Sequence, residues 1–179
     1  MFLGCTESAP PLAADRAAPV KEIAPEQTQA AKVDVRPVDR KQFDAVIADH
    51  KGKVVLVDYW ATWCLPCVEQ LPHTIGLAEK FRDQGLAVVT VSCDEPDEAA
   101  RVSELLSTKS TGIATNLISQ FGGSSRTMEE FEIASGTVPY YAIYDRTGRL
   151  RKTFGVNPIA KTQYTPTDID VAVEALLAE

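Results

Sequence analysis

Residues 54–67 read Val54-Val55-Leu56-Val57-Asp58-Tyr59-Trp60-Ala61-Thr62-Trp63-Cys64-Leu65-Pro66-Cys67. The apolar run 54–57 is short and rich in β-branched residues, which predicts a buried strand of a parallel sheet. Helical periodicity extends from Val68 to Gln84 and ends at Gly85. The two cysteines therefore straddle the first turn of a helix that directly follows a buried strand. Pro66 fits this first turn because its missing N–H costs little there.

The position of the two cysteines gives them a chemical use. Their spacing lets both sulfurs reach disulfide distance within one helical turn. The unpaired N–H groups and the positive dipole end of the helix stabilise a thiolate on Cys64, and the thiolate is the nucleophile in disulfide exchange. Cys67 lies deeper in the helix, so we expect it to be less exposed and to act as the resolving thiol.

Other uses of a C-x-x-C pair fit the sequence less well. A zinc site takes four ligands, and the chain has no second C-x-x-C. Its two histidines, His50 and His73, are too far apart in the sequence to form an i, i+4 ligand pair. A c-type haem site requires a histidine directly after the second cysteine, where this chain has Val68. A structural disulfide remains open, although so small a loop stabilises a fold little. The spacing and the preceding strand favour a redox-active dithiol.

The body of the chain alternates between strand and helix patterns. We expect further strands at Val33–Val35, Leu86–Ser92, Tyr140–Tyr144 and Arg149–Phe154, with a turn at Asp145–Gly148. We expect helices after Asp39 (Phe43–His50) and at Asp97–Thr108, Met128–Ile133 and Thr167–Ala178. This order predicts an α/β fold whose sheet is parallel at first and ends in an antiparallel hairpin.

Length and charge limit the function classes. The 179 residues fit one domain with a tail, and 18 basic against 25 acidic residues give a net charge of −7, which argues against a nucleic-acid partner. The apolar runs are far shorter than the ~20 residues that span a bilayer. We expect residues 33–179 to form the domain, and residues 1–32 to be a signal-like remnant and a disordered tether rich in Ala and Pro.

The first five residues carry a signal of their own. Met1-Phe2-Leu3-Gly4-Cys5 resembles the end of a bacterial lipoprotein signal, in which a small residue precedes the lipidated cysteine. If translation starts upstream, Cys5 would carry a lipid, and residues 6–31 would hold the domain away from the membrane. The alternative is that Cys5 is an incidental thiol.

Residues Val55–Cys67 resemble the active-site strand and loop of thioredoxins, and Ala61–Cys64 is most similar to the envelope reductases of the TlpA/ResA type. Thr137-Val138-Pro139 matches a second family signature, in which a cis-proline faces the disulfide. The resemblance covers roughly residues 34–179. It implies a thioredoxin-like fold, with a mixed central sheet flanked by helices on both faces and an insertion (95–136) before the cis-proline. It implies no cofactor and no metal.

The resemblance also implies roles for the redox residues. Cys64 would attack a partner's disulfide, and Cys67 would resolve the mixed disulfide and leave this protein oxidised. Asp58 would be a buried carboxyl with a raised pKa that carries the proton of Cys67. The alternative for Asp58 is a carboxylate satisfied by local hydrogen bonds.

Substrate contact is implied for four residues around the cysteines. Val138 and Pro139 would hold the partner's extended backbone beside Cys64, and Trp63 and Pro66 would complete the surface. The implied substrates are protein disulfides of the bacterial envelope or periplasm, such as the cysteine pair of apocytochrome c or the thiol pair of a copper site. A membrane partner would supply the electrons.

Some residues depart from the family pattern. Gln70 stands where these reductases often carry an acidic residue, and no lysine on the strand 86–92 is a clear partner for Asp58. We expect Cys93 to be a buried structural thiol, with a third redox thiol as the alternative. The acidic group that begins at Asp94 (Asp94, Glu95, Asp97 and Glu98) is expected to be a solvated helix start.

A second function from another class is a copper-binding metallochaperone on the same fold. Cys64 and Cys67 would then be soft ligands for Cu(I). Such proteins usually add a histidine from a distant loop. The available histidines, His50 and His73, both lie outside the region 95–139 where that ligand is expected.

Overall fold

The computed structural model describes Met1 and residues 32–109 and 112–179. Cys5 and the predicted tether up to residue 31 lie outside the described residues. The described elements are β1 (Arg36–Val38), α1 (Arg40–Asp49), β2 (Val54–Trp60), α2 (Leu65–Phe81), β3 (Leu86–Ser92), α3 (Ala99–Lys109), β4 (Thr115–Ser119), α4 (Ser125–Glu130), β5 (Tyr140–Tyr144), β6 (Leu150–Gly155) and α5 (Pro166–Leu177). Short 3₁₀ helices occupy Arg82–Gln84 and Pro96–Glu98.

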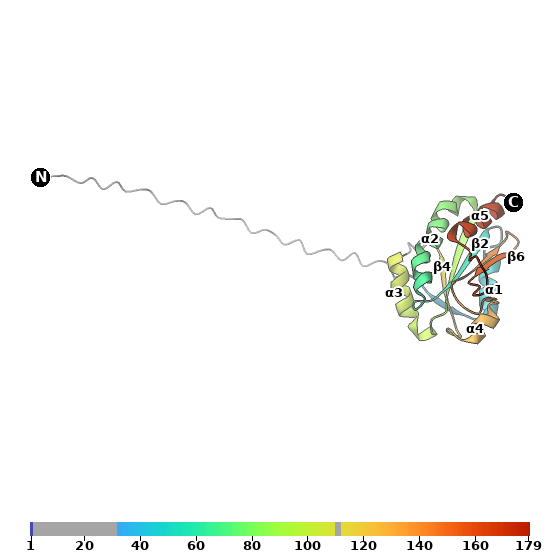
Figure 1. The fold of residues 1–179 in the computed structure, drawn as a ribbon, viewed down its shortest axis with the longest axis horizontal. Coiled ribbons are helices and arrows are strands. Elements are labelled where there is room, and N and C mark those ends of the chain that lie inside the picture. The colour runs from blue at the N-terminus through green and yellow to red at the C-terminus, as the bar shows by residue number, and fades with distance from the viewer. Residues whose placement is uncertain (2–31, 110–111) are drawn as a thin grey trace.

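The strands form one mixed sheet in the order β1-β4-β3-β2-β5-β6 (Figure 1). Strands β1, β4, β3 and β2 are parallel, whereas β5 is antiparallel to β2 and β6 is antiparallel to β5. The predicted α/β class, with a parallel part followed by an antiparallel hairpin, is therefore confirmed.

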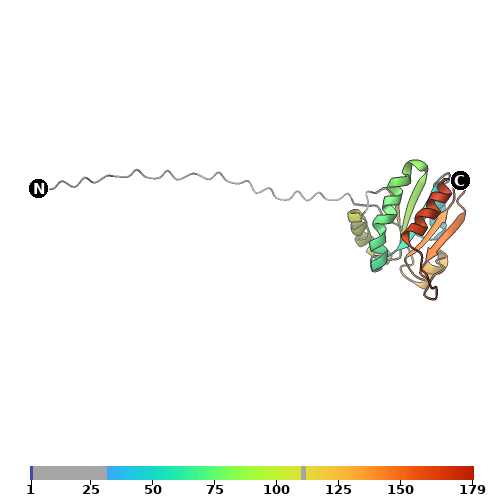
Figure 2. The ribbon, with the colours of Figure 1, turned by 45° about the horizontal axis from the view of Figure 1, so that its top comes forward.

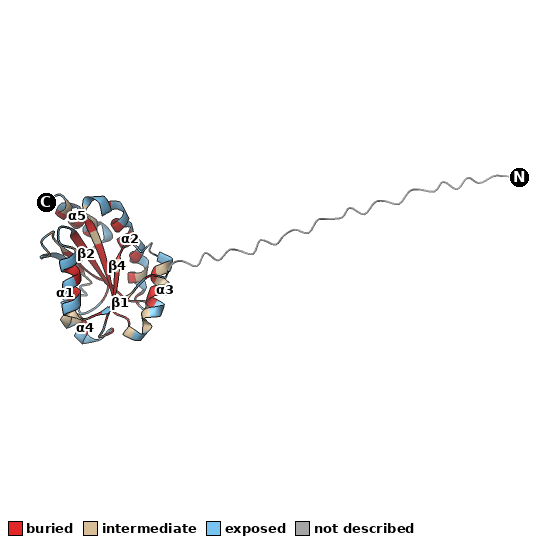
Figure 3. Ribbon diagram, turned by 180° about the vertical axis from the view of Figure 1, so that it is seen from behind, coloured by how far each residue is buried: buried red, intermediate tan, exposed pale blue. Residues whose placement is uncertain are grey.

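Strand β2 lies at the centre and is buried along its whole length. Its alternate side chains enter two different hydrophobic clusters, Val55 and Val57 on one face and Val54 and Leu56 on the other. This two-sided burial explains why β2 is continuously apolar rather than alternating. Figure 3 shows the buried sheet between helices whose outer faces are exposed.

The helices divide between the two faces of the sheet. Buried residues of α1 and α3 belong to the first cluster and those of α5 to the second, whereas α2 contributes Cys67 and Leu71 to the first and its later buried apolar residues to the second. Helices α2 and α5 lie side by side (Figure 2), joined by a hydrogen bond between His73 and Asp170 and by an ion pair from Lys80 to Glu174. The body of α2, whose start carries the site, is thus held by β2 and by α5.

The first strand lies at β1 and not at the predicted Val33–Val35. Pro37 does not end this strand, because β1 is at the edge of the sheet, where a missing N–H costs no ladder hydrogen bond. Val33 instead binds α3: its N–H donates to the Ser107 hydroxyl (3.2 Å), and its carbonyl accepts from Ser103.

Strand β4 was not predicted from the sequence. Its polar residues interrupt the apolar pattern that predicts a buried strand. In the structure, Asn116, Leu117, Ile118 and Ser119 are nevertheless all buried. The Asn116 side chain is satisfied inside the sheet, where it accepts a hydrogen bond from the Thr90 hydroxyl (2.9 Å). The predicted helices are present with slightly shifted bounds, and Asp39 caps α1 as expected, in a capping box with Gln42.

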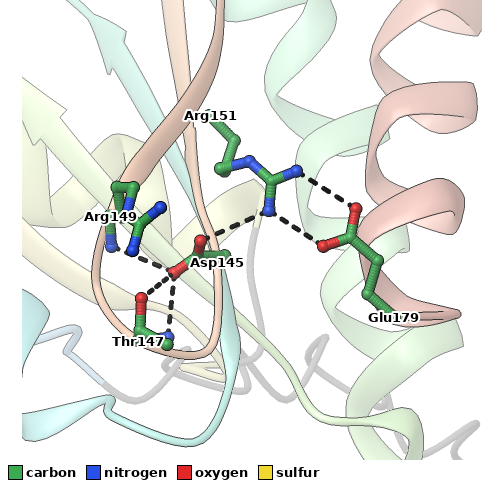
Figure 4. Close-up of polar contacts among 5 residues, drawn as sticks. All are labelled: Asp145, Thr147, Arg149, Arg151 and Glu179. Atoms are coloured by element: carbon green, nitrogen blue, oxygen red, sulfur yellow. Dashed lines mark hydrogen bonds and ion pairs between the residues drawn. The ribbon is translucent and has the colours of Figure 1, made fainter.

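The hairpin turn between β5 and β6 is fixed by hydrogen bonds at the edge of the domain (Figure 4). The Asp145 carboxylate accepts from the N–H and hydroxyl of Thr147, from the Arg149 N–H and from the Arg151 guanidinium. The hydrogen bond from the Thr147 hydroxyl is the largest of the effects that lower the pKa of Asp145. Arg151 also binds Glu179, so the hairpin is tied to the chain beyond α5.

Arg146, in the same turn, joins three separate segments. Its guanidinium donates to the carbonyls of Gly52 (3.1 Å), Gln84 (3.3 Å) and Leu177 (3.2 Å). These carbonyls lie in the turn before β2, in the turn before β3 and at the end of α5. Because β2 begins here and reaches the cysteines only at its other end, this contact supports the fold without taking part in the site.

We predict that Arg146→Ala lowers the free energy of unfolding by about 1–3 kcal/mol, because three carbonyls lose a charged donor. Urea unfolding followed by circular dichroism measures the change. Arg149→Ala is the matched control, since Arg149 is exposed and contacts Asp145 through its backbone N–H (Figure 4). Equal loss of stability in the two variants would contradict the assignment.

Candidate active site

The two cysteines of the motif form a disulfide at the N-terminus of α2. Their Cα atoms are 5.3 Å apart. Cys64 is the N-cap residue with an extended backbone, and Cys67 lies in the first turn. The helix begins at Leu65, earlier than its apolar periodicity indicated, because Pro66 is accepted in a first turn. The Val68 N–H closes this turn by donating to the Cys64 carbonyl (3.1 Å).

The two sulfur-bearing residues differ in exposure. Cys64 retains 6% of its accessible surface, whereas Cys67 retains none. The flanking residues are open to solvent: Trp63 is 58% exposed, Leu65 is 68% exposed, and Pro66 is also exposed. A partner can therefore reach Cys64 across an apolar surface, while Cys67 is covered by the protein.

The loop that carries Trp63 and Cys64 is fixed by a buried carboxylate. Asp94 is only 1% exposed and accepts hydrogen bonds from the Thr62 N–H (2.9 Å), the Thr62 hydroxyl (2.6 Å) and the Ser92 hydroxyl (2.6 Å). The expectation that Asp94 belongs to a solvated helix start is therefore wrong, although Glu95 beside it is exposed. The available signal was its place at the carboxyl end of the strand next to β2.

The backbone of Gly123 packs closely against the side chain of Trp63. A Cβ atom on Gly123 would lie 3.3 Å from Cζ2 of Trp63 and 3.2 Å from the Cys93 carbonyl oxygen, both closer than ordinary packing. The loop after β4 therefore approaches Trp63 through backbone alone. Nothing in the local sequence around Gly123 indicates this long-range contact.

Val138 and Pro139 lie at the same end of the sheet as the cysteines. The peptide bond between them is cis, as the family signature implies. Both residues are buried, and Val138 belongs to the same hydrophobic cluster as Cys64 and Cys67. Strand β5 begins directly afterwards, and its Tyr140 pairs with Tyr59 near the end of β2.

Asp58 is fully buried on the face of β2 that α2 covers. Its Oδ2 accepts a hydrogen bond from the Thr74 hydroxyl (2.7 Å), and its Oδ1 has no partner among the described residues. Burial raises the pKa of Asp58 from 3.8 to about 7, and the Thr74 hydrogen bond opposes this rise. Thr74 was not singled out from the sequence, although it shares the buried face of α2 with Cys67.

Two other residues near the motif, Trp60 and Cys93, lie in the hydrophobic core. Trp60 is fully buried in the core. Cys93 is also fully buried, and its N–H donates to the Trp60 carbonyl (2.7 Å). Burial raises the pKa of the Cys93 thiol to about 12, with a smaller contribution from Asp94. A thiol of this pKa stays protonated near neutral pH, which is the opposite of a reactive cysteine.

The two histidines interact with partners other than the cysteines. Nε2 of His50 is 3.4 Å from the Thr115 hydroxyl, and Nε2 of His73 is 2.8 Å from the Asp170 carboxylate. Within residues 32–109 and 112–179, no group of three or more His, Cys, Asp or Glu side chains is arranged to hold a metal ion.

In the described part of the chain, no helix has the length and apolar character needed to cross a membrane.

Comparisons with known proteins agree with this geometry. The sequence profile of the AhpC/TSA family matches residues 20–168. The thiol–disulfide oxidoreductase ResA of Bacillus anthracis is 26% identical over 133 residues, which cover 74% of this chain and 60% of that protein. ResA of Bacillus thuringiensis subsp. konkukian is 26% identical over 113 residues, or 63% of this chain and 49% of that protein. The chain thus spans about half the length of the curated relatives it matches.

A solved structure supports the fold. The thioredoxin domain of a thiol–disulfide oxidoreductase from Bacteroides vulgatus superposes with a TM-score of 0.55 at 22% identity, over 73% of this chain and 83% of that one. At this identity the likeness establishes the fold alone, and it agrees with the mixed sheet and flanking helices described above. The chain therefore belongs to the AhpC/TSA family, has a thioredoxin-like fold and is similar in sequence to thiol–disulfide oxidoreductases named ResA.

Proposed function

We propose that this protein is a thiol–disulfide oxidoreductase in which Cys64 is the nucleophile and Cys67 is the resolving thiol. One observation carries the proposal: a disulfide closes the first turn of α2, with one sulfur-bearing residue at the accessible helix end and the other covered. The helix N-terminus stabilises negative charge on Cys64, which makes it the better attacking and leaving group of the two.

The reaction proceeds in two exchanges. In the reduced protein, the Cys64 thiolate attacks one sulfur of a substrate disulfide, forms a mixed disulfide and releases the other substrate sulfur as a thiolate, which takes up a proton. Cys67 then loses its proton, and its sulfur attacks Cys64, which releases the second substrate thiolate. The substrate gains two electrons, the Cys64–Cys67 disulfide forms, and an external dithiol donor reduces it again.

Asp58 is the proton acceptor for Cys67 in this scheme. The second exchange requires Cys67 to become a thiolate inside the protein, where desolvation opposes charge. A carboxyl with a pKa of about 7 accepts and returns a proton near neutral pH, which an ordinary aspartate does poorly. Asp58 and Cys67 are both fully buried, Asp58 on β2 and Cys67 in the first turn of α2, which packs against β2.

The substrate is an extended segment of another protein. Trp63 and Pro66 offer exposed apolar surface on either side of Cys64. Val138 and Pro139 precede β5 at the same end of the sheet and align the substrate backbone beside Cys64. Contact is therefore made through backbone and apolar groups, which suits substrates of varied sequence.

The cellular setting extends the proposal. The protein works in the bacterial envelope, where it reduces the disulfide of a partner such as apocytochrome c or a copper-site protein, and a membrane dithiol donor supplies its electrons. Cys5 carries a lipid that holds the domain near that donor. Similarity to proteins named ResA supports this setting.

We predict that Cys67→Ser accumulates mixed disulfides with its substrates through Cys64, because the resolving thiol is absent and Cys93 is buried. Cells that express the variant are quenched in acid, and the trapped complexes are identified by non-reducing electrophoresis and mass spectrometry. Cys64→Ser is the matched control and should trap little, since Cys67 is covered. Equal trapping by the two variants would reverse the assignment of the nucleophile.

We predict that Asp58 makes the oxidised protein less stable as the pH rises from 4 to 7. The raised pKa means that the folded protein retains the Asp58 proton in this window while the unfolded chain has lost it. The free energy of unfolding therefore falls with pH, by on the order of 4 kcal/mol for a shift of about three units, and levels off above pH 7. Asp58→Asn cannot ionise and lacks this fall.

Urea unfolding of the wild type and of Asp58→Asn, at a series of pH values, measures the difference. Asp145 and Asp168 have lowered pKa values and act in the opposite sense at lower pH, but they are present in both proteins. The difference between the two curves therefore isolates Asp58. Parallel curves between pH 4 and 7 would mean that Asp58 is ionised throughout.

A further inference from the structure

The exposed carboxylate of Glu95 lies beside the surface that carries the active-site tryptophan. Glu95 follows β3 and directly precedes the short 3₁₀ helix Pro96–Glu98. A Cβ atom on Gly122, in the loop after β4, would overlap the Glu95 carboxyl group, so that group rests directly on the backbone of this loop. The next residue, Gly123, is the one whose backbone packs against Trp63. Glu95 and Trp63 therefore contact neighbouring residues of one loop.

Two glycines make this close approach possible. Gly122 has a φ of +60°, a conformation that favours glycine, and a side chain there would also displace the Glu95 carboxylate. A side chain on Gly123 would press against Trp63. At these two positions the loop therefore places no side chain between the carboxylate and the ring.

We propose that Glu95 and the exposed ring of Trp63 together recognise a basic side chain of the substrate, so that the protein favours disulfides that lie next to an arginine or a lysine. Glu95 is then a specificity-determining residue, which adds a preference for charge to the backbone and apolar contacts described above. The inference rests on the proposed reaction with protein disulfides, and it deepens that function by naming a class of substrate.

The carboxylate of Glu95 is available to bind a cation. Within residues 32–109 and 112–179 it makes no hydrogen bond and no ion pair. The arginines of the adjoining helices α3 and α4 have other partners: Arg101 lies 3.4 Å from Glu98, and Arg126 lies 3.6 Å from Glu130. A basic side chain of a substrate would therefore meet a carboxylate that no described cation neutralises.

Trp63 supplies the second half of the recognition. Its side chain is 58% exposed beside Cys64. An indole ring attracts a guanidinium or ammonium group placed over its face, which strengthens binding at exposed sites by about two- to fivefold. A carboxylate binds the edge of a guanidinium through two parallel hydrogen bonds. Because arginine is planar and can use both contacts at once, we expect it to be preferred over lysine.

The test compares two synthetic peptides that contain one disulfide and differ at the residue next to a cysteine. One peptide has arginine there, and the other has citrulline, which has nearly the same shape but no charge. In stopped-flow measurements at low salt, the reduced wild type should reduce the arginine peptide about fivefold faster, and Glu95→Gln should lower this ratio to less than about two. Glu95→Lys should reverse the preference. Salt should weaken the preference of the wild type, because the ion pair is screened.

Asp97→Asn is the matched control, because it removes another exposed carboxylate two residues away, in the adjoining 3₁₀ helix. This variant should keep the ratio of the wild type. A general attraction of basic peptides by the net charge of −7 would instead be weakened equally by Glu95→Gln and Asp97→Asn. An equal ratio in the wild type and Glu95→Gln, or an equal loss in the two variants, would overturn the proposal.

A binding measurement separates this proposal from the proposed reaction. Reduced and S-methylated forms of the same peptides cannot exchange disulfides, and they are titrated into the oxidised protein while NMR follows the Trp63 indole N–H. The arginine form should bind the wild type about fivefold more tightly than the citrulline form, and this difference should be lost in Glu95→Gln. Equal binding of both forms to the wild type would overturn the role of Glu95. Failure of the reduced wild type to reduce either peptide would instead contradict the proposed function.

Discussion

The boundary between Cys64 and the first turn of α2 is the feature on which the structure depends. A helix N-terminus stabilises a thiolate only if the sulfur stays at its free N–H groups, so the helix must begin where it does. Strand β2 determines this position, because it is paired on both sides and buried throughout. The Cys93 N–H holds the end of β2 at Trp60, and Asp94 holds Thr62 in the loop that follows.

Two buried carboxyl groups near this boundary have different environments and different uses. Asp94 accepts three hydrogen bonds and fixes the loop, so it serves the geometry. Asp58 accepts one hydrogen bond, has one oxygen without a described partner and keeps its proton up to about pH 7. The number of donors around each group therefore separates a structural carboxylate from one that can exchange a proton.

The sequence was sufficient for the features encoded locally. The apolar run of β2, the cysteine spacing and Pro66 predicted the strand–turn–helix unit, and Thr137-Val138-Pro139 predicted the cis-proline through family resemblance. Features that depend on distant partners were missed. Strand β4 contains a buried polar residue, Asn116, because this side chain accepts a hydrogen bond from Thr90 on the neighbouring strand. The local sequence around Asp94 indicates the start of a helix, and only the fold shows that Asp94 binds Thr62.

The central claim is that the fold makes Cys64 a stabilised thiolate while it covers Cys67. The direct measurement is the pH dependence of alkylation of Cys64 in the reduced protein, resolved by mass spectrometry from that of Cys67 and Cys93. The account predicts an apparent pKa for Cys64 well below the ~8.5 of a free cysteine, with slow reaction of Cys67 and Cys93. An apparent pKa at or above that value, with Cys64 reacting no faster than the buried Cys93, would contradict it.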